Sequence, residues 1–151
     1  MGLDRRSDLT GTIASVSDWN FADVWELVAA AHPDAAALGQ GPKRVAWQEF
    51  DRRADGVAAG LLAGGLGRQA KVAEYMYNCP EYMETLFGVF KAGMVPVNTN
   101  YRYTEDELVY LWDNADAEAV VFHGSGRFAA VLCRRKQALT SATAKAQPAT
   151  M

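Results

Sequence analysis

Apolar residues recur three or four positions apart in four stretches of the chain, and this spacing predicts four amphipathic helices. The stretches cover residues 21–31, 50–62, 80–92 and 105–115. Residues that favour helix ends mark their limits. Asn20, Asn78 and the capping box of Thr104 and Glu107 precede helices, while His32–Pro33, Gly64–Gly65 and Gly93 follow them.

Short apolar runs between these stretches predict five strands, at residues 35–38, 44–47, 71–77, 94–97 and 118–122. The first two flank the turn-rich segment 39–42, so we expect them to form a hairpin. From Lys71 onward the order is strand, helix, strand, helix, strand, which is typical of a parallel sheet with right-handed crossovers. The predicted fold is therefore α/β, with a three-layer arrangement in which helices flank a mostly parallel sheet.

The two ends of the chain lack this periodicity. Residues 1–18 predict a flexible N-terminal arm, and residues 19–123 carry all the regular pattern. In the segment 124–151 we expect a frayed helix around residues 128–132 and then a divergent, disordered tail, because residues 137–151 are mostly Ala, Thr, Ser, Lys and Pro.

Composition excludes several classes of function. The 151 residues are 50% hydrophobic with a formal net charge of -3, and no basic stripe indicates a nucleic-acid partner. Cys79 and Cys133 are too few for a disulfide framework, and His32 and His123 have no paired spacing for a metal site. We find neither a secretory signal nor the run of about 20 apolar residues that a transmembrane segment needs. A cytoplasmic, reduced protein is expected.

Two segments have the composition of phosphate-binding loops but not the context. Residues 65–70 match the dinucleotide pattern G-x-G-x-x-A. That motif needs a strand before it and a helix after it, and here the predicted order is reversed. The segment 140–145 has hydroxyls and Lys145 but no glycine, so its backbone amides cannot form a close phosphate cradle. We interpret neither segment as a cofactor site.

Isolated polar residues are also interpreted as structural. Asp113, Asp116 and Glu118 straddle a predicted helix end, which favours a solvated surface over a metal site. His123 lies at the carboxyl end of a predicted strand, where ligands of α/β sheets gather, but no partner residue is recognisable. Cys79 lies near a helix N-terminus, which would lower its pKa. Core and interface positions are predicted for five tyrosines: Tyr75, Tyr77, Tyr101, Tyr103 and Tyr110.

Several short sequence motifs nevertheless follow one another in a characteristic order along the chain. Residues 45–54 place an aromatic residue and Glu49 before a helix, residues 77–82 contain N-x-x-E-Y, and residues 90–98 join a helix end, Phe-Lys-Ala-Gly, to a strand ending in Pro-Val-Asn. Residues 98–103, 107–111 and 114–117 follow in order. Over about residues 20–123 the chain resembles the N-terminal part of adenylate-forming enzymes: acyl-CoA synthetases, luciferases and peptide-synthetase adenylation domains. It is most similar to bacterial fatty-acid-CoA ligases.

The resemblance implies a two-step ligase. Such enzymes use ATP and Mg²⁺ to convert a fatty acid or related carboxylate into an acyl-adenylate, which coenzyme A then attacks. The chain departs from the family because it contains no phosphate loop ending in lysine and no C-terminal catalytic lysine. We therefore expect a truncated or frameshifted ligase that is inactive alone and binds none of these cofactors. The alternative is a non-enzymatic interaction domain that pairs with itself or with a full-length ligase.

No catalytic, cofactor-binding or metal-binding residue is predicted in this chain. The residues that match family motifs are expected to be scaffold: Asn78, Glu81, Lys91, Gly93 and Asn98. Lys91 has the chemistry of a phosphate binder, but its position at a helix end favours a role as partner of the helix dipole.

Overall fold

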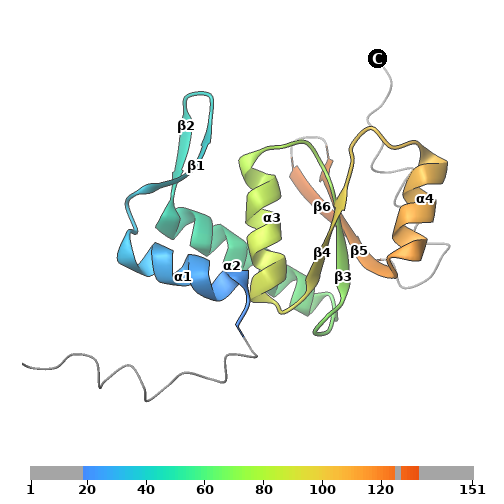
Figure 1. Cartoon of the computed structure of the whole chain (residues 1–151), viewed down its shortest axis with the longest axis horizontal. Coiled ribbons are helices and arrows are strands. Elements are labelled where there is room, and N and C mark those ends of the chain that lie inside the picture. The colour runs from blue at the N-terminus through green and yellow to red at the C-terminus, as the bar shows by residue number, and fades with distance from the viewer. Residues whose placement is uncertain (1–18, 125–126, 133–151) are drawn as a thin grey trace, which may run out of the picture.

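The computed structural model describes residues 19–124 and 127–132 (Figure 1). Four helices are present in this part of the chain: α1 (Phe21–Ala31), α2 (Trp47–Ala63), α3 (Pro80–Lys91) and α4 (Glu105–Asn114). The strands are β1 (Ala36–Gln40), β2 (Lys43–Ala46), β3 (Lys71–Tyr75), β4 (Val95–Thr99), β5 (Ala117–Gly124) and β6 (Arg127–Leu132). All four predicted helices and all five predicted strands are therefore confirmed, with shifts of a few residues at their ends.

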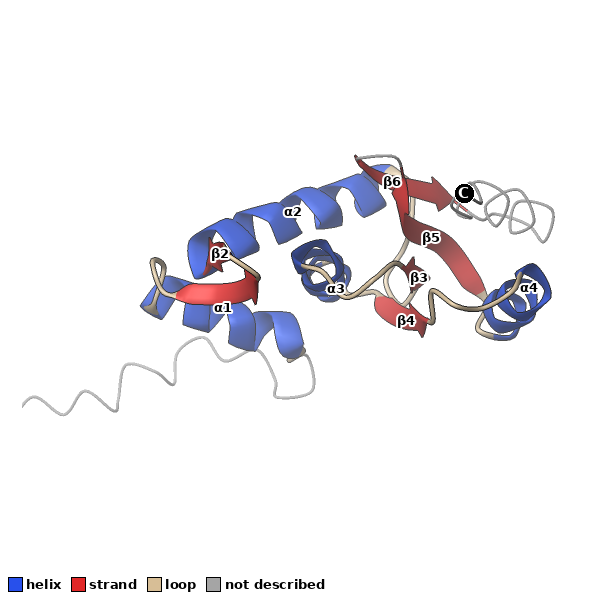
Figure 2. Ribbon diagram, turned by 90° about the horizontal axis from the view of Figure 1, so that it is seen from above, coloured by secondary structure: helices blue, strands red, loops and turns tan. Residues whose placement is uncertain are grey.

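The main sheet has the strand order β4-β3-β5-β6. Strand β3 is central and pairs in parallel with both β4 and β5, with Glu74 opposite Asn98 on one side and Val121 on the other. Helices α2 and α3 cover one face and α4 covers the other (Figure 2). The predicted three-layer α/β fold is confirmed. Strands β1 and β2 form the expected antiparallel hairpin beside α1 and α2.

Strand β6 corrects the prediction of a frayed helix around residues 128–132. It pairs antiparallel with β5, with Gly124 opposite Arg127 and Ala119 opposite Leu132. A short apolar run does not distinguish helix from strand by its period, and here pairing along the edge of β5 selects the strand. The predicted arm at 1–18 and the tail beyond residue 132 lie outside the described residues.

Local capping interactions set two of the helix starts, as predicted. The Asn20 side chain accepts a hydrogen bond from the Ala22 amide at 2.6 Å, and Asp23 accepts one from the Asn20 amide. At α4, the Thr104 amide and hydroxyl both donate to Glu107 at 2.8 Å. These bonds lower the pKa of the Glu107 carboxyl. Both pairs satisfy amides that a helix end leaves without partners.

The other two helices begin differently from the prediction. Cys79, and not Asn78, is the N-cap residue of α3; the Asn78 carbonyl instead accepts a hydrogen bond from the Gln40 side chain at 3.4 Å. Helix α2 begins at Trp47, earlier than residue 50, and its cap residue makes no side-chain bond. Its first amides donate to the carbonyls of Ala35 and Pro33, so a distant segment of the chain serves as the cap.

Three buried clusters hold the layers together. Trp112 and Leu108 of α4 pack on one face of the sheet. Leu61 of α2 and Val89 of α3 pack on the other. Phe50 and Phe87 lie at the centre of a third cluster, which joins α1 and the hairpin to α2 and α3. Their rings are 4.9 Å apart, and Trp25 of α1 packs edge-on to Phe87. No helix of the described residues is both long and apolar enough to span a membrane.

Gly88 allows α3 to approach α2 closely. A Cβ atom at this position would lie 2.6 Å from the Val57 Cβ and 2.7 Å from the Ala54 carbonyl oxygen. One of these neighbours is backbone and cannot rotate away. Only glycine therefore fits here without moving one helix.

We predict that Gly88→Ala destabilises the fold by about 2 kcal/mol or more, because the added methyl group overpacks a rigid contact. Gly56→Ala and Gly60→Ala are the matched controls, since nothing lies within 4 Å of a Cβ at either position. Each control should be neutral or stabilise the protein by about 0.5–1 kcal/mol. Urea unfolding of the three variants measures the difference. Equal midpoints for Gly88→Ala and the wild type would contradict the close packing.

Candidate functional site

The carboxyl ends of β3, β4 and β5 meet at one edge of the sheet. Strand β3 continues into α3 on one face, whereas its neighbour β4 continues into α4 on the opposite face (Figure 2). Adjacent strands that lead to opposite faces define a switch point, and ligands of open α/β sheets bind in the crevice formed there. This edge is the candidate functional site.

Tyrosines occupy the two loops at the switch point. Tyr77 follows β3 and Tyr101 follows β4, and their ring centroids are 4.4 Å apart. Tyr77 is 58% exposed and Tyr101 is 41% exposed. The Arg102 guanidinium lies 5.5 Å from the centre of the Tyr101 ring, and its Nε donates to the Tyr101 hydroxyl. We call Tyr77, Tyr101 and Arg102 the aromatic edge.

Hydrogen bonds fix the loop after β4, which carries Tyr101 and Arg102. The Tyr75 hydroxyl donates to the Tyr101 carbonyl at 3.2 Å, and the Asn100 side chain accepts from the Arg102 amide at 3.0 Å. At the end of β4, the buried Trp112 indole donates to the Thr99 hydroxyl at 3.1 Å. The core position predicted for Tyr75 is confirmed. Tyr77, Tyr101, Tyr103 and Tyr110 are exposed, and their interface positions stay a prediction.

Cys79, Glu81 and His123 lie at the same edge, but their electrostatics do not favour a nucleophile. Burial, together with Glu81, raises the pKa of the Cys79 thiol, which contradicts the lowering expected from the helix N-terminus. Burial alone would raise the pKa of Glu81, yet its own amide, the Cys79 thiol and the charges of His123 and Lys43 outweigh that effect and lower it. A protonated thiol is a poor nucleophile.

Lys91 is not placed to bind phosphate. Its side chain is only 8% exposed, and Nζ lies 2.6 Å from Asp51, 3.1 Å from Glu26 and within contact of Asp55. Burial alone would lower its pKa, but hydrogen bonds to these three carboxylates outweigh burial and raise it. The ammonium therefore joins α1 and α2 to the last turn of α3. We call these four residues the Lys91 hub.

The hub also explains a group of acids that sequence reasoning missed. Oxygens of Glu26, Asp51 and Asp55 lie within 4.8 Å of one another, a spacing that suits a metal ion. The Lys91 ammonium sits among them and supplies the positive charge. Only the helical spacing of Asp51 and Asp55 on one face of α2 could have suggested this arrangement.

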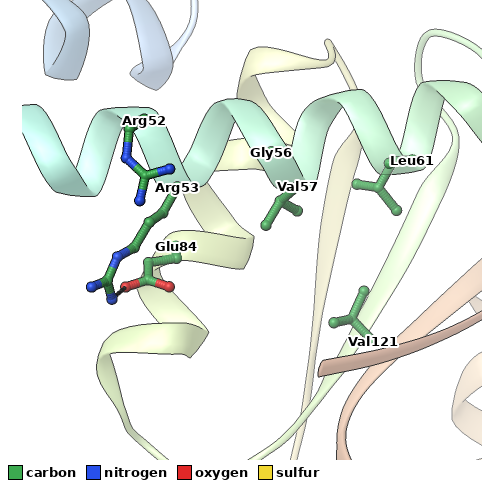
Figure 3. A pocket seen from close by; sticks show the side chains of 8 residues that line it. Arg52, Arg53, Gly56, Val57, Leu61, Glu84 and Val121 are labelled. Atoms are coloured by element: carbon green, nitrogen blue, oxygen red, sulfur yellow. Dashed lines mark hydrogen bonds and ion pairs between the residues drawn. The ribbon is translucent and has the colours of Figure 1, made fainter. Parts of the chain in front are cut away.

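A cavity of about 490 Å³ opens between α2, α3 and β5 (Figure 3). Its polar end carries Arg52, Arg53 and Glu84, and Val57, Leu61 and Val121 form apolar walls. Arg53 bonds to Glu84 at 2.9 Å and to Glu49 at 2.7 Å, and Arg52 bonds to Glu49. Both arginines lower the pKa of Glu49 to about 2. These two cations are thus balanced by two carboxylates.

The remaining candidates are placed as follows. The segment 65–70 is the turn between α2 and β3, and Gly65 and Gln69 have φ values of 82° and 66°, so the interpretation as a helix-stopping loop is confirmed. Gly93 has φ 66° after α3, as expected for a helix stop. Among the described residues Asp113, Asp116 and Glu118 do not form a metal-type cluster. The segment 140–145 lies outside the described residues.

Comparison with known proteins identifies the family. The chain belongs to the AMP-binding enzyme family, which matches residues 25–150. It is 37% identical over 102 residues to a medium/long-chain-fatty-acid–CoA/3-oxocholest-4-en-26-oate–CoA ligase of Mycobacterium marinum, covering 68% of this chain and 18% of that protein. A medium-chain acyl-CoA ligase, Mig, of Mycobacterium avium is 35% identical over 115 residues, covering 68% of this chain and 21% of Mig. The chain spans about a fifth of the length of these curated relatives.

Solved structures agree on the fold. A protein of Rhodopseudomonas palustris described as a long-chain-fatty-acid CoA ligase superposes with a TM-score of 0.65 and 30% identity, over 70% of this chain and 27% of that one. The N-terminal subdomain of NpsA from Klebsiella oxytoca superposes with a TM-score of 0.63 and 22% identity, over 67% of this chain and 26% of that one. The resemblance inferred from residues 20–123 is confirmed, and the family match continues to residue 150.

We predict that Lys91→Met destabilises the protein by about 3 kcal/mol at pH 7, because it leaves three neighbouring carboxylates without their cation. Lys43→Met, which removes an exposed lysine, should change stability by less than about 0.5 kcal/mol. Urea unfolding at pH 7 measures the effect. A Lys91→Met protein as stable as Lys43→Met would contradict a structural role for the hub.

Proposed function

We propose that this chain is the N-terminal part of a fatty-acid-CoA ligase, an enzyme of the cytoplasm that uses ATP to activate a carboxylic acid and transfers it to coenzyme A. The observation that carries the proposal is the 37% identity over 102 residues with the M. marinum ligase. Substrates named for that relative, medium- and long-chain fatty acids and a steroid acid, are the class we assign to the whole enzyme.

We further propose that the 151 residues do not catalyse this reaction alone. Activation of a carboxylate by ATP needs amides and cations that stabilise charge on the phosphates. The cations of the Lys91 hub and of the cavity do not fit a triphosphate, since Lys91 contacts three acids and Arg52 and Arg53 contact two. The glycine turn at 65–70 is followed by a strand and not by a helix N-terminus. We derive no catalytic step through ATP from these residues.

We predict that the purified chain shows no ATP–pyrophosphate exchange above background with medium- or long-chain fatty acids. The full-length M. marinum ligase is the positive control. Exchange that depends on both fatty acid and Mg²⁺ would contradict the proposal of inactivity.

A chimaera tests the family role separately. Replacing the matching region of the M. marinum ligase with residues 20–123 of this chain should preserve acyl-CoA synthesis. The same chimaera carrying Gly88→Ala should lose activity together with stability. A folded but inactive parent chimaera would contradict the proposed ligase scaffold.

A second function, as a non-enzymatic interaction domain, is favoured by one specific observation. Large apolar side chains are exposed on two surfaces: Phe21, Val24 and Leu27 on α1, and Tyr77 and Tyr101 at the aromatic edge. Tyrosine and arginine are enriched at protein interfaces, where they contribute most of the binding energy. We therefore infer that the aromatic edge, at the switch point, contacts the part of a ligase that this chain does not span. Self-association is the competing outcome.

We predict that the chain captures an M. marinum ligase from which the matching N-terminal region has been deleted. Tyr77→Asp should weaken this binding at least tenfold, as expected for a buried hot-spot aromatic. Leu62→Asp on α2 is the matched control, because Leu62 is 53% exposed, Tyr77 is 58% exposed, and Leu62 belongs to neither of these two surfaces. Surface plasmon resonance with purified proteins measures the affinities. Equal affinity for the wild type and Tyr77→Asp, or binding of the chain only to itself, would rule out this contact.

A further inference from the structure

Glu74 is an acidic residue in the middle of the central strand. It lies on β3 between Asn98 of β4 and Val121 of β5, and its exposed fraction is 0%. Because side chains alternate along a strand, Glu74 shares its face of the sheet with Val72 and Met76. Those two residues belong to the apolar cluster under α2 and α3, so the Glu74 carboxyl is enclosed by hydrophobic neighbours.

No hydrogen bond of good geometry reaches either carboxyl oxygen of Glu74 from the described residues, although the Tyr82 phenol lies close enough to interact with the carboxyl. An ionised carboxylate in such a place loses its hydration with little compensation, which disfavours the charged form. The protein avoids this cost if the group stays protonated. Burial accordingly raises the pKa of Glu74 to about 8, although the Tyr82 phenol lowers it in part.

Among the residues that the structure describes, the elements packed around Glu74 offer no free cation. Helix α3 contributes the phenol of Tyr82, whose own pKa is raised to about 12 by burial and by Glu74. It also contributes Glu84, which is bonded to Arg53 of α2. The strand neighbours in β4 and β5 are Asn98 and Val121, which do not titrate. Ionisation of Glu74 therefore leaves a negative charge that the Tyr82 phenol stabilises only in part.

We propose that Glu74 is a pH-sensitive latch between the sheet and α3: it stays neutral while α3 is packed on β3, and its ionisation loosens the first turns of α3. Tyr82 stands in the first turn of that helix, and the loop before it carries Tyr77 to the aromatic edge. Loosening the start of α3 would move Tyr77 relative to Tyr101 and Arg102. The proposal does not depend on the function proposed above.

The direction of the pH effect follows from the two protonation states. In the unfolded chain the carboxyl loses its proton near its ordinary pKa of 4.5, whereas in the folded chain it keeps it up to about pH 8. Between these values the folded state binds more protons, so stability falls as pH rises. The folding equilibrium constant should fall about tenfold per pH unit in this window, on the order of a thousandfold in total. Above pH 8 the folded chain itself carries the charge.

The experiment uses the whole chain, Glu74→Gln and the control Glu118→Gln, which changes an exposed glutamate on the neighbouring strand β5. Carbon-13 NMR of labelled glutamate side chains gives the titration midpoint of Glu74, with its signal assigned by its absence from Glu74→Gln. We expect a midpoint near pH 8. Urea unfolding at pH 5.5, 7 and 8.5 should show falling stability in the wild type and in Glu118→Gln, with a much flatter profile in Glu74→Gln.

Hydrogen exchange then locates the loosening. Protection factors of amides in residues 81–86 should fall above pH 8 in the wild type and stay constant in Glu74→Gln. A midpoint near 4.5 would overturn the proposal, as would the same pH profile in Glu74→Gln and the wild type. If Glu74→Gln does not fold, Glu74→Met replaces it, and the NMR midpoint of the wild type decides the outcome without any variant.

Discussion

The close packing of α3 against α2 is the constraint on which the remaining structure depends. Gly88 brings the two helix backbones together, and Phe87 and Phe50 fill the space beside that contact. One turn later, Lys91 binds acids from α1 and α2. Because α3 also covers β3 and leads into β4, a shift of this helix would disturb the helical layer and the parallel sheet together.

The ion pairs on the helices join elements of the scaffold to one another. Lys91, Arg52 and Arg53 are bound to carboxylates of the helices, whereas Tyr77, Tyr101 and Arg102 gather at the carboxyl edge of the sheet. The aromatic edge lies at the place where open α/β sheets receive their ligands.

Sequence reasoning succeeded where a structure depends on residues within a few positions. Asn20 and Thr104 begin helices through bonds to residues two or three positions away, and Gly93 ends one by its own backbone angle. It failed where distant segments decide. Strand β6 depends on pairing with β5. Helix α2 begins at Trp47 because the carbonyls of residues 33 and 35 accept hydrogen bonds from its first amides. The prediction that the pKa of Cys79 is lowered was wrong for a related reason, since burial raises this pKa more than the helix N-terminus lowers it.

The amino-acid sequence by itself determined the order of the elements, the α/β class and the family, because periodicity, caps and motifs are local patterns. Only the tertiary structure decided what the charged and aromatic residues do. Lys91 became the centre of an ion-pair hub, in addition to the helix-dipole partner that its position predicted, and Glu74 became a buried acid with no cation beside it among the described residues. The physical reason is that burial and electrostatic pairing depend on distances between side chains, and the folded chain sets those distances across gaps of tens of residues.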